Sequence, residues 1–129
     1  MLVVDASVVV EAALGGRRLE DLGDNLVAPP LLWPEARCAI RQAYWRGVVA
    51  PTEAQTARHA LAQANVTARE HMDLADEAWQ IANELGWAKT YDAEYVALAS
   101  LLGCRLVTVD GRLRRGADRL GFVIGPLEL

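Results

Sequence analysis

The sequence predicts an α/β fold, a three-layer α/β/α sandwich built around a short, mostly parallel central sheet. Two apolar runs, residues 2–5 and 105–110, are short and continuous rather than alternating, which is typical of parallel strands buried on both faces. Helical stretches separate the expected strands, as right-handed crossovers in one sheet require. The length of 129 residues is that of one compact domain, so we expect a single domain over residues 1–129.

The first part of the chain is expected to form two strands and one helix. Residues 2–5 form the first strand, and Ser7 is suited to cap a helix over residues 8–14. Residues 26–28 form a second short strand. Pro29 stops it, because proline has no backbone N–H to give to a sheet.

The middle of the chain is expected to form two helices. Pro34 is tolerated in a first helical turn, which predicts a helix over residues 35–46. Residues 52–55 read Thr-Glu-Ala-Gln, the form of a capping box, and should open a helix that runs towards residue 65.

The last part of the chain is expected to form two helices and two strands. One helix spans residues 73–85, and a second spans residues 91–102 with Thr90 as its cap. Strands are expected at residues 105–110 and 122–124.

The composition fits a globular protein without a membrane span. Apolar residues make up 53% and charged residues 23% of the chain, a balance that argues against disorder. No apolar run reaches the roughly 20 residues of a membrane helix, and no basic segment precedes the first strand. We therefore expect a soluble, cytoplasmic protein without membrane contact, in which Cys38 and Cys104 are two buried thiols.

The charges are unevenly distributed along the chain. A net charge of −4 argues against a general cationic nucleic-acid binder. Residues 70–94 hold seven acids and one lysine, whereas residues 105–119 hold five arginines and two aspartates. The domain is therefore expected to carry separate acidic and basic faces.

Four acids fall where an α/β sheet collects its functional groups. Asp5 and Asp110 end expected strands, and Glu35 and Asp92 lie in the first turns of expected helices. Parallel strands end at the edge where the following helices begin, so these carboxylates can converge there. Clustered carboxylates repel one another and need protons or a cation. An all-oxygen site without clustered histidine or cysteine selects Mg²⁺ or Mn²⁺.

Two hydroxyl groups are expected beside these acids. Thr108 has the same strand parity as Asp110, and Ser7 follows Asp5 by two residues. A simpler interpretation also holds, because the helix dipole alone favours an acid at the start of a helix. The sequence pattern leaves open whether each of the four acids is a metal ligand or a helix cap.

Several segments of the chain form one pattern in a fixed order. They are Leu2-Val3-Val4-Asp5-Ala6-Ser7, Glu35 shortly after Pro30-Leu31, Tyr91-Asp92-Ala93-Glu94-Tyr95-Val96-Ala97-Leu98-Ala99, and Leu106-Val107-Thr108-Val109-Asp110 followed by Leu113. This pattern resembles the PIN-domain family, and within it the VapC-type toxin ribonucleases of type II toxin–antitoxin systems. The resemblance covers the whole chain, fills all four acidic positions and implies a PIN-like sandwich.

The resemblance also implies an Mg²⁺-dependent endoribonuclease, with Mn²⁺ as a substitute. Asp5 and Asp92 would be the main metal ligands, and Asp110 would complete the shell beside Thr108. Glu35 would hold a second metal or orient the attacking water. A metal-activated water would attack an RNA phosphodiester in line and leave a 5′-phosphate and a 3′-hydroxyl. The implied partners are a cognate VapB-type antitoxin and a second copy of the chain, in a larger complex when the antitoxin is bound.

Arginines near the acids are candidate contacts to RNA or to the antitoxin. The candidates just beyond Asp110 and along the Glu35 helix are Arg112, Arg114, Arg115, Arg37 and Arg41. A solvated basic face is the alternative interpretation of the same residues.

Two other features are expected to face solvent or a partner. Glu94 lies two residues from Asp92, about 200° around a helix axis, and is interpreted as a solvated or interface acid. Trp33, with Leu31 and Leu32, is the candidate for a partner-facing apolar patch.

Two other functions remain open from the sequence. The chain could be a non-catalytic acidic binding module that acts through a small regulatory partner. It could also be a DNA-directed PIN nuclease, since no feature of the sequence identifies a contact to a ribose 2′-hydroxyl.

Overall fold

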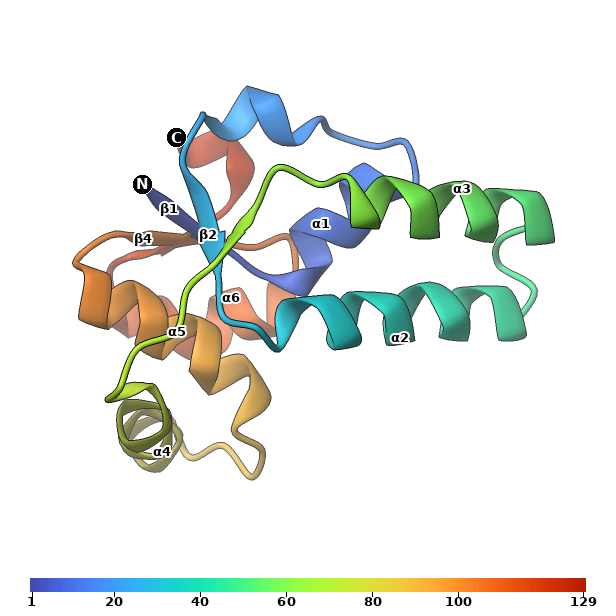
Figure 1. The fold of residues 1–129 in the computed structure, drawn as a ribbon. Helices are drawn as coiled ribbons and strands as arrows, with labels where there is room; N and C mark the ends of the chain where they lie inside the picture. The colour runs from blue at the N-terminus through green and yellow to red at the C-terminus, as the bar shows by residue number, and fades with distance from the viewer.

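A short, entirely parallel sheet lies at the centre of the molecule (Figure 1). The structure, a computed structural model, describes residues 1–129. The strands are β1 (Leu2–Val4), β2 (Leu26–Ala28), β3 (Thr67–Ala68), β4 (Arg105–Val107) and β5 (Val123–Ile124), in the order β3-β2-β1-β4-β5. Val4 of β1 pairs with Val107 of β4, so these two central strands end at the same level. The predicted α/β class with a parallel sheet is confirmed.

The chain forms six α-helices. They are α1 (Ala6–Ala13), α2 (Leu32–Trp45), α3 (Pro51–Ala62), α4 (Leu74–Leu85), α5 (Tyr91–Leu102) and α6 (Gly111–Ala117). Short 3₁₀ turns follow at Leu19–Leu22, Asp118–Leu120 and Pro126–Glu128. The α2–α3 pair extends away from the sheet, whereas α5 packs against β1 and β4 and carries α4 on its other side (Figure 1).

The core explains why the strands are apolar without alternation. Val3 and Val4 of β1 and Leu106 and Val107 of β4 are fully buried, as strands covered on both faces must be. Helix α5 is also buried along most of its length, and Tyr95 is the largest fully buried side chain. The central position of α5 holds its first turn against the carboxyl edge of the sheet.

Several helix starts differ from the predicted ones. Asp5, not Ser7, caps α1, because its Oδ1 accepts a hydrogen bond from the Val8 N–H at 3.2 Å. Helix α3 begins at Pro51 and not through a Thr52 cap; Glu53 Oε1 accepts from the Ala50 N–H at 3.0 Å. Thr90 precedes α5 as predicted but makes no capping hydrogen bond. The predicted helices exist, but α1, α2 and α3 begin one to three residues earlier than expected, and neither Ser7 nor Thr52 is the cap.

The end of β4 is the main difference in the strands. The predicted strand over residues 105–110 stops at Val107, and Asp110 is instead the N-cap of α6, a helix that the sequence analysis did not predict. The edge strand β3 was also not predicted, because both of its residues are exposed and carry no apolar signal.

Two burial predictions were wrong. Cys38 is exposed on α2, between the buried Ala36 and Ile40, while Cys104 is partly buried. Leu32 is fully buried, so it cannot belong to an exposed patch; Leu31 and Trp33 are partly buried against the core. None of the helices is long and apolar enough to cross a membrane.

Candidate active site at the carboxyl edge of the sheet

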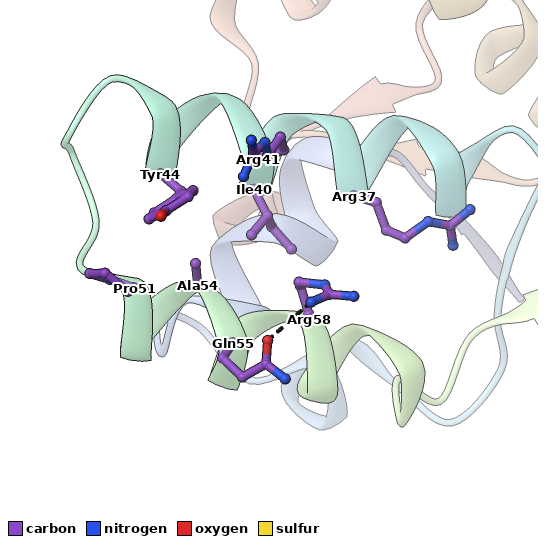
Figure 2. Close-up of a pocket in the computed structure, with 8 residues that line it drawn as sticks. All are labelled: Arg37, Ile40, Arg41, Tyr44, Pro51, Ala54, Gln55 and Arg58. Carbon is purple, nitrogen blue, oxygen red and sulfur yellow. Dashed lines mark hydrogen bonds between the residues drawn. The ribbon is translucent and has the colours of Figure 1, made fainter.

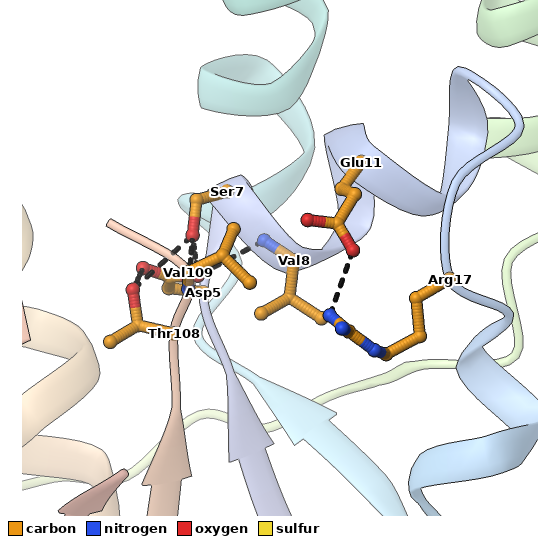
Figure 3. Close-up of polar contacts among 7 residues, drawn as sticks. All are labelled: Asp5, Ser7, Val8, Glu11, Arg17, Thr108 and Val109. Atoms are coloured by element: carbon orange, nitrogen blue, oxygen red, sulfur yellow. Dashed lines mark hydrogen bonds and ion pairs between the residues drawn. The ribbon is translucent and has the colours of Figure 1, made fainter. Parts of the chain in front are cut away.

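The ends of β1 and β4 bring Asp5 and Thr108 together (Figure 3). Thr108 Oγ1 donates to Asp5 Oδ2 at 2.5 Å, and Ser7 Oγ donates to Asp5 Oδ1 at 2.6 Å. The Ser7 and Thr108 hydroxyls lie 3.2 Å apart, and Ser7 Oγ also accepts from the Val109 N–H at 3.1 Å. Asp5 is only 4% exposed, so this hydroxyl pair fixes a buried carboxylate in one orientation.

Burial raises the pKa of Asp5 to about 6. Burial is the largest cause, because it disfavours the charged carboxylate. The hydrogen bonds from Ser7, Thr108 and Val8 lower the pKa again, and the negative charge of Asp110 adds a smaller rise. Asp5 is therefore ionised at neutral pH and takes up a proton in mildly acidic solution.

Glu35 reaches the same edge from the first turn of α2. The buried Tyr95 hydroxyl on α5 donates to Glu35 Oε1 at 2.8 Å, which joins the two helices across the site. Burial raises the pKa of Glu35, the Tyr95 hydrogen bond lowers it, and the charges of Asp92 and Glu94 raise it further. Burial and the Glu35 charge also raise the pKa of Tyr95, so its proton stays on the phenol.

Asp92 and Asp110 complete the group. Asp110 Oδ1 caps α6 by accepting from the Arg112 N–H at 2.9 Å, and the Asp110 N–H donates to Thr108 Oγ1 at 3.0 Å. Burial, followed by the charge of Asp110, raises the pKa of Asp92, whereas the charges of Arg112 and Lys89 lower it. The negative charge of Asp110 thus raises the pKa of both Asp5 and Asp92, and the charge of Asp92 raises the pKa of Glu35.

We call Asp5, Glu35, Asp92 and Asp110 the acidic cluster. Thr108 bonds both the Asp5 carboxylate and the Asp110 backbone, and Tyr95, on the helix that carries Asp92, bonds Glu35. The helix-cap interpretation also applies to two members, since Asp5 caps α1 and Asp110 caps α6. One carboxylate can cap a helix and also bind a cation, because its two oxygens offer about four lone-pair positions.

The donor chemistry of the acidic cluster fits a hard divalent cation. All of its side-chain oxygens are carboxylate oxygens, the type that Mg²⁺ and Mn²⁺ prefer. Asp92 accepts no hydrogen bond, and Glu35 and Asp110 each keep one oxygen free of protein donors. No three acidic, histidine or cysteine side chains are arranged so that they could hold one ion together.

Two residues beside the cluster were not among the predicted site residues. Glu94, expected to be a solvated or interface acid, is partly buried, and its charge raises the pKa of Glu35. Tyr95 lies within the recognised segment, but its contact to Glu35 was not foreseen. Its position three residues after Asp92 indicates that Tyr95 shares a helix face with Asp92, but not that it contacts Glu35.

The three arginines beyond Asp110 have different surroundings. Arg114 ion-pairs with Glu128, and its Nη2 lies 3.6 Å from Asp118 Oδ1, so its charge is compensated within the chain. Arg115 places its guanidinium beside Gly111, at the start of α6. Arg112 makes no ion pair and lines a cavity with Asp92. Of the three, Arg112 is thus the one directed towards the acidic cluster.

Arg37 and Arg41 lie in a different place, a groove between α2 and α3 (Figure 2). Its volume is about 430 Å³, and Arg58 of α3 adds a third guanidinium. Ile40 and Ala54 are among its apolar lining residues, and Arg41 stacks over the Tyr44 ring at 5.2 Å. The groove is therefore basic with an apolar floor, and no member of the acidic cluster lines it.

Comparison with known proteins identifies the family. The PIN domain model matches residues 2–119, and the chain belongs to the PIN domain family. It is 33% identical over 115 residues to VapC ribonuclease Mb0985 of Mycobacterium bovis and to Ribonuclease VapC9 of Mycobacterium tuberculosis. In both cases the match covers 88% of this chain and 88% of the relative.

Two solved structures share the fold. PAE2754 from Pyrobaculum aerophilum superposes with a TM-score of 0.75 at 23% identity, covering 98% of this chain and 90% of the other. A chain of a toxin–antitoxin complex from Klebsiella pneumoniae superposes with a TM-score of 0.67 at 20% identity, covering 98% of each chain.

Proposed function

We propose that this protein is the toxin of a type II toxin–antitoxin pair, an Mg²⁺-dependent endoribonuclease that hydrolyses RNA phosphodiester bonds. The observation that carries the proposal is the convergence of Asp5, Asp92, Asp110 and Glu35 at the carboxyl edge of the sheet. The ribonuclease names of relatives that are 33% identical support the choice of RNA as substrate.

The chain's own residues would prepare the site for metal-assisted hydrolysis. Asp5, Asp92 and Asp110 would hold Mg²⁺, and the hydroxyls of Ser7 and Thr108 keep the Asp5 carboxylate in place. When bound, such an ion neutralises phosphate charge and lowers the pKa of a coordinated water. Glu35, held by Tyr95, would hold a second ion or orient the attacking water. The products would carry a 5′-phosphate and a 3′-hydroxyl.

RNA cleavage by the purified protein tests this proposal. We expect Mg²⁺ or Mn²⁺ to support cleavage, EDTA to stop it, and Asp5→Asn to abolish it. Asp24→Asn is a matched control, because Asp24 is an exposed acid just before β2, at the opposite edge of the sheet. Mapping the 5′ ends of cleaved cellular RNA after expression would identify the substrate and the cleavage sequence.

The same assay separates the alternatives. A DNA-directed nuclease would cut a single-stranded DNA of the same sequence at least as fast as the RNA. A non-catalytic binding module would cut neither nucleic acid in any metal, and its expression without a partner would leave growth unchanged.

The proposed partner is a VapB-type antitoxin, and the α2–α3 groove is a suitable place for it. Arg37, Arg41 and Arg58 would contact acidic side chains, while Ile40 and Ala54 would pack against apolar ones. Co-purification of the neighbouring gene product tests this, with Arg37→Gln combined with Arg41→Gln expected to weaken capture. Homodimer formation is also proposed, and light scattering with and without the antitoxin measures it.

A further inference from the structure

A second cavity opens directly beside Asp92. It lies between the loop that joins α4 to α5 and the first turn of α6, and its volume is about 320 Å³. Its lining residues are Gly86, Trp87, Ala88, Lys89, Asp92, Arg112 and Leu113. The cavity therefore shares one wall, Asp92, with the acidic cluster, and its size falls in the range of small-ligand pockets.

The two cations of this cavity are available to a ligand. Lys89, the only lysine of the chain, and Arg112 are both exposed, and neither forms an ion pair with a carboxylate. Neighbouring arginines are engaged elsewhere: Arg114 pairs with Glu128, and Arg119 donates to the Glu84 carbonyl.

Trp87 holds the two walls of the cavity together. A Cβ added at Gly116 of α6 would lie 3.1 Å from Cζ2 of Trp87 and 3.2 Å from its Nε1. The indole therefore packs edge-on against α6 at a position that tolerates only glycine without a shift. This contact fixes the Lys89 loop relative to α6, the helix that carries Arg112.

An RNA strand needs positive charge at this place. A metal in the acidic cluster would neutralise the phosphate being cut but leaves the adjacent phosphate uncompensated. In this cavity that second phosphate would lie near Asp92, whose negative charge repels it. Phosphate contacts from lysine and arginine supply most of the affinity of a protein for nucleic-acid backbone.

We propose that this cavity is a substrate subsite, in which Lys89 and Arg112 bind the phosphate next to the scissile one. The inference rests on the proposed ribonuclease function and adds two residues that position the RNA strand. Lys89 and Arg112 touch a non-reacting phosphate, so they contribute to binding of the strand rather than to the bond-breaking step.

Steady-state kinetics with a short RNA that contains the mapped cleavage site tests the subsite. Lys89→Gln combined with Arg112→Gln should raise KM about tenfold or more and leave kcat within about twofold. The slope of log KM against log salt should fall by about 0.7 for each lost phosphate contact to a single strand. Arg105→Gln is the control, because Arg105 is exposed at the opposite end of β4 and should change neither value.

A neutral linkage identifies the phosphate itself. Two substrates are needed, one with a methylphosphonate on the 5′ side of the cleavage site and one with it on the 3′ side. With the unsubstituted protein, one of these substrates should show the same rise in KM that the double variant shows with ordinary RNA. The double variant should then show no additional rise with that substrate, and Lys89→Arg should retain binding.

The outcomes separate this inference from the proposed function. If the unsubstituted protein cuts no RNA, the proposed function fails. If it cuts RNA but the double variant matches Arg105→Gln, only the subsite is overturned. A fall in kcat at unchanged KM would also overturn it, because that result means the two cations act on Asp92 alone.

Discussion

Thr108 Oγ1 donates a 2.5 Å hydrogen bond to Asp5 Oδ2, although 103 positions separate the two residues in the chain. The bond forms because β1 and β4 are adjacent parallel strands that end at the same level. Thr108 is 2% exposed, so water cannot replace its hydroxyl. The geometry of the buried acid therefore depends on a side chain that is not itself acidic.

Thr108→Val should destabilise the protein most where Asp5 is ionised. Valine keeps the shape of threonine but removes a donor to a buried carboxylate, a loss of about 1.5–3 kcal/mol in unfolding free energy at pH 7.5. The pKa of Asp5 should rise further above about 6, because a hydrogen bond that favours the charged form is gone. Urea unfolding at pH 7.5 and pH 4 measures this. Thr52→Val, at an exposed position, should change little, and an equal loss at both pH values would contradict the prediction.

Asp5→Asn should abolish cleavage without destabilising the fold. The pKa of Asp5 in the folded protein, about 6, lies above its ordinary value of 3.8. Protonated Asp5 therefore contributes its full share to the stability of the folded state below pH 3.8. That stability is lost as the pH rises through about 6, at a cost of up to about 3 kcal/mol. Denaturation in EDTA should therefore find the variant at least as stable as the parent at pH 7.5, with the difference shrinking towards pH 4. A clear loss at pH 7.5 would show that ionised Asp5 supports the fold.

Mg²⁺ should stabilise the protein through the acidic cluster. An ion that binds only the folded state adds about 2.7 kcal/mol of stability at a concentration 100 times its Kd. Protons compete for the same carboxylates, and the pKa values of Asp5, Glu35 and Asp92 are all raised, so the gain should fade in mildly acidic buffer. Thermal unfolding at constant ionic strength measures it. Asp92→Asn should lose the Mg²⁺-dependent rise in Tm, and Asp24→Asn should keep it; a rise retained in Asp92→Asn would exclude Asp92 as a ligand.

The parallel sheet and the position of the acids could be predicted because they depend on local signals. The buried runs around Val3 and Leu106 are too apolar and too short for anything but central parallel strands. Asp5, which directly follows such a strand, must lie at the carboxyl edge, whereas Asp110 lies three residues beyond the end of β4 and is the N-cap of α6. The same reasoning placed Glu35 and Asp92 there, since helices begin where the strands end.

The remaining features depend on tertiary packing. Helix α6 was missed because Gly111 and Gly116 weaken its helical signal, while the Asp110 cap and the Trp87 packing stabilise it in the fold. The burial of Leu32 could not be predicted, since one helical turn was assigned to a loop. The pairing of Tyr95 with Glu35 requires α2 and α5 to meet, which no local pattern encodes.

Tyr95→Phe should change how activity depends on pH. The Tyr95 hydroxyl donates to Glu35 Oε1 at 2.8 Å and lowers the pKa of that carboxyl against the effects of burial and of Asp92. Without the hydroxyl, the pKa of Glu35 should rise, so the acidic limb of the kcat profile should move to higher pH. Because Tyr95 contacts Glu35 rather than substrate, KM should stay nearly constant while kcat falls. Tyr91→Phe on the same helix is the matched control, because the Tyr91 side chain is exposed and donates to no carboxylate. Superimposable pH profiles for the two variants would mean that the hydroxyl of Tyr95 serves packing alone and that Glu35 acts without it.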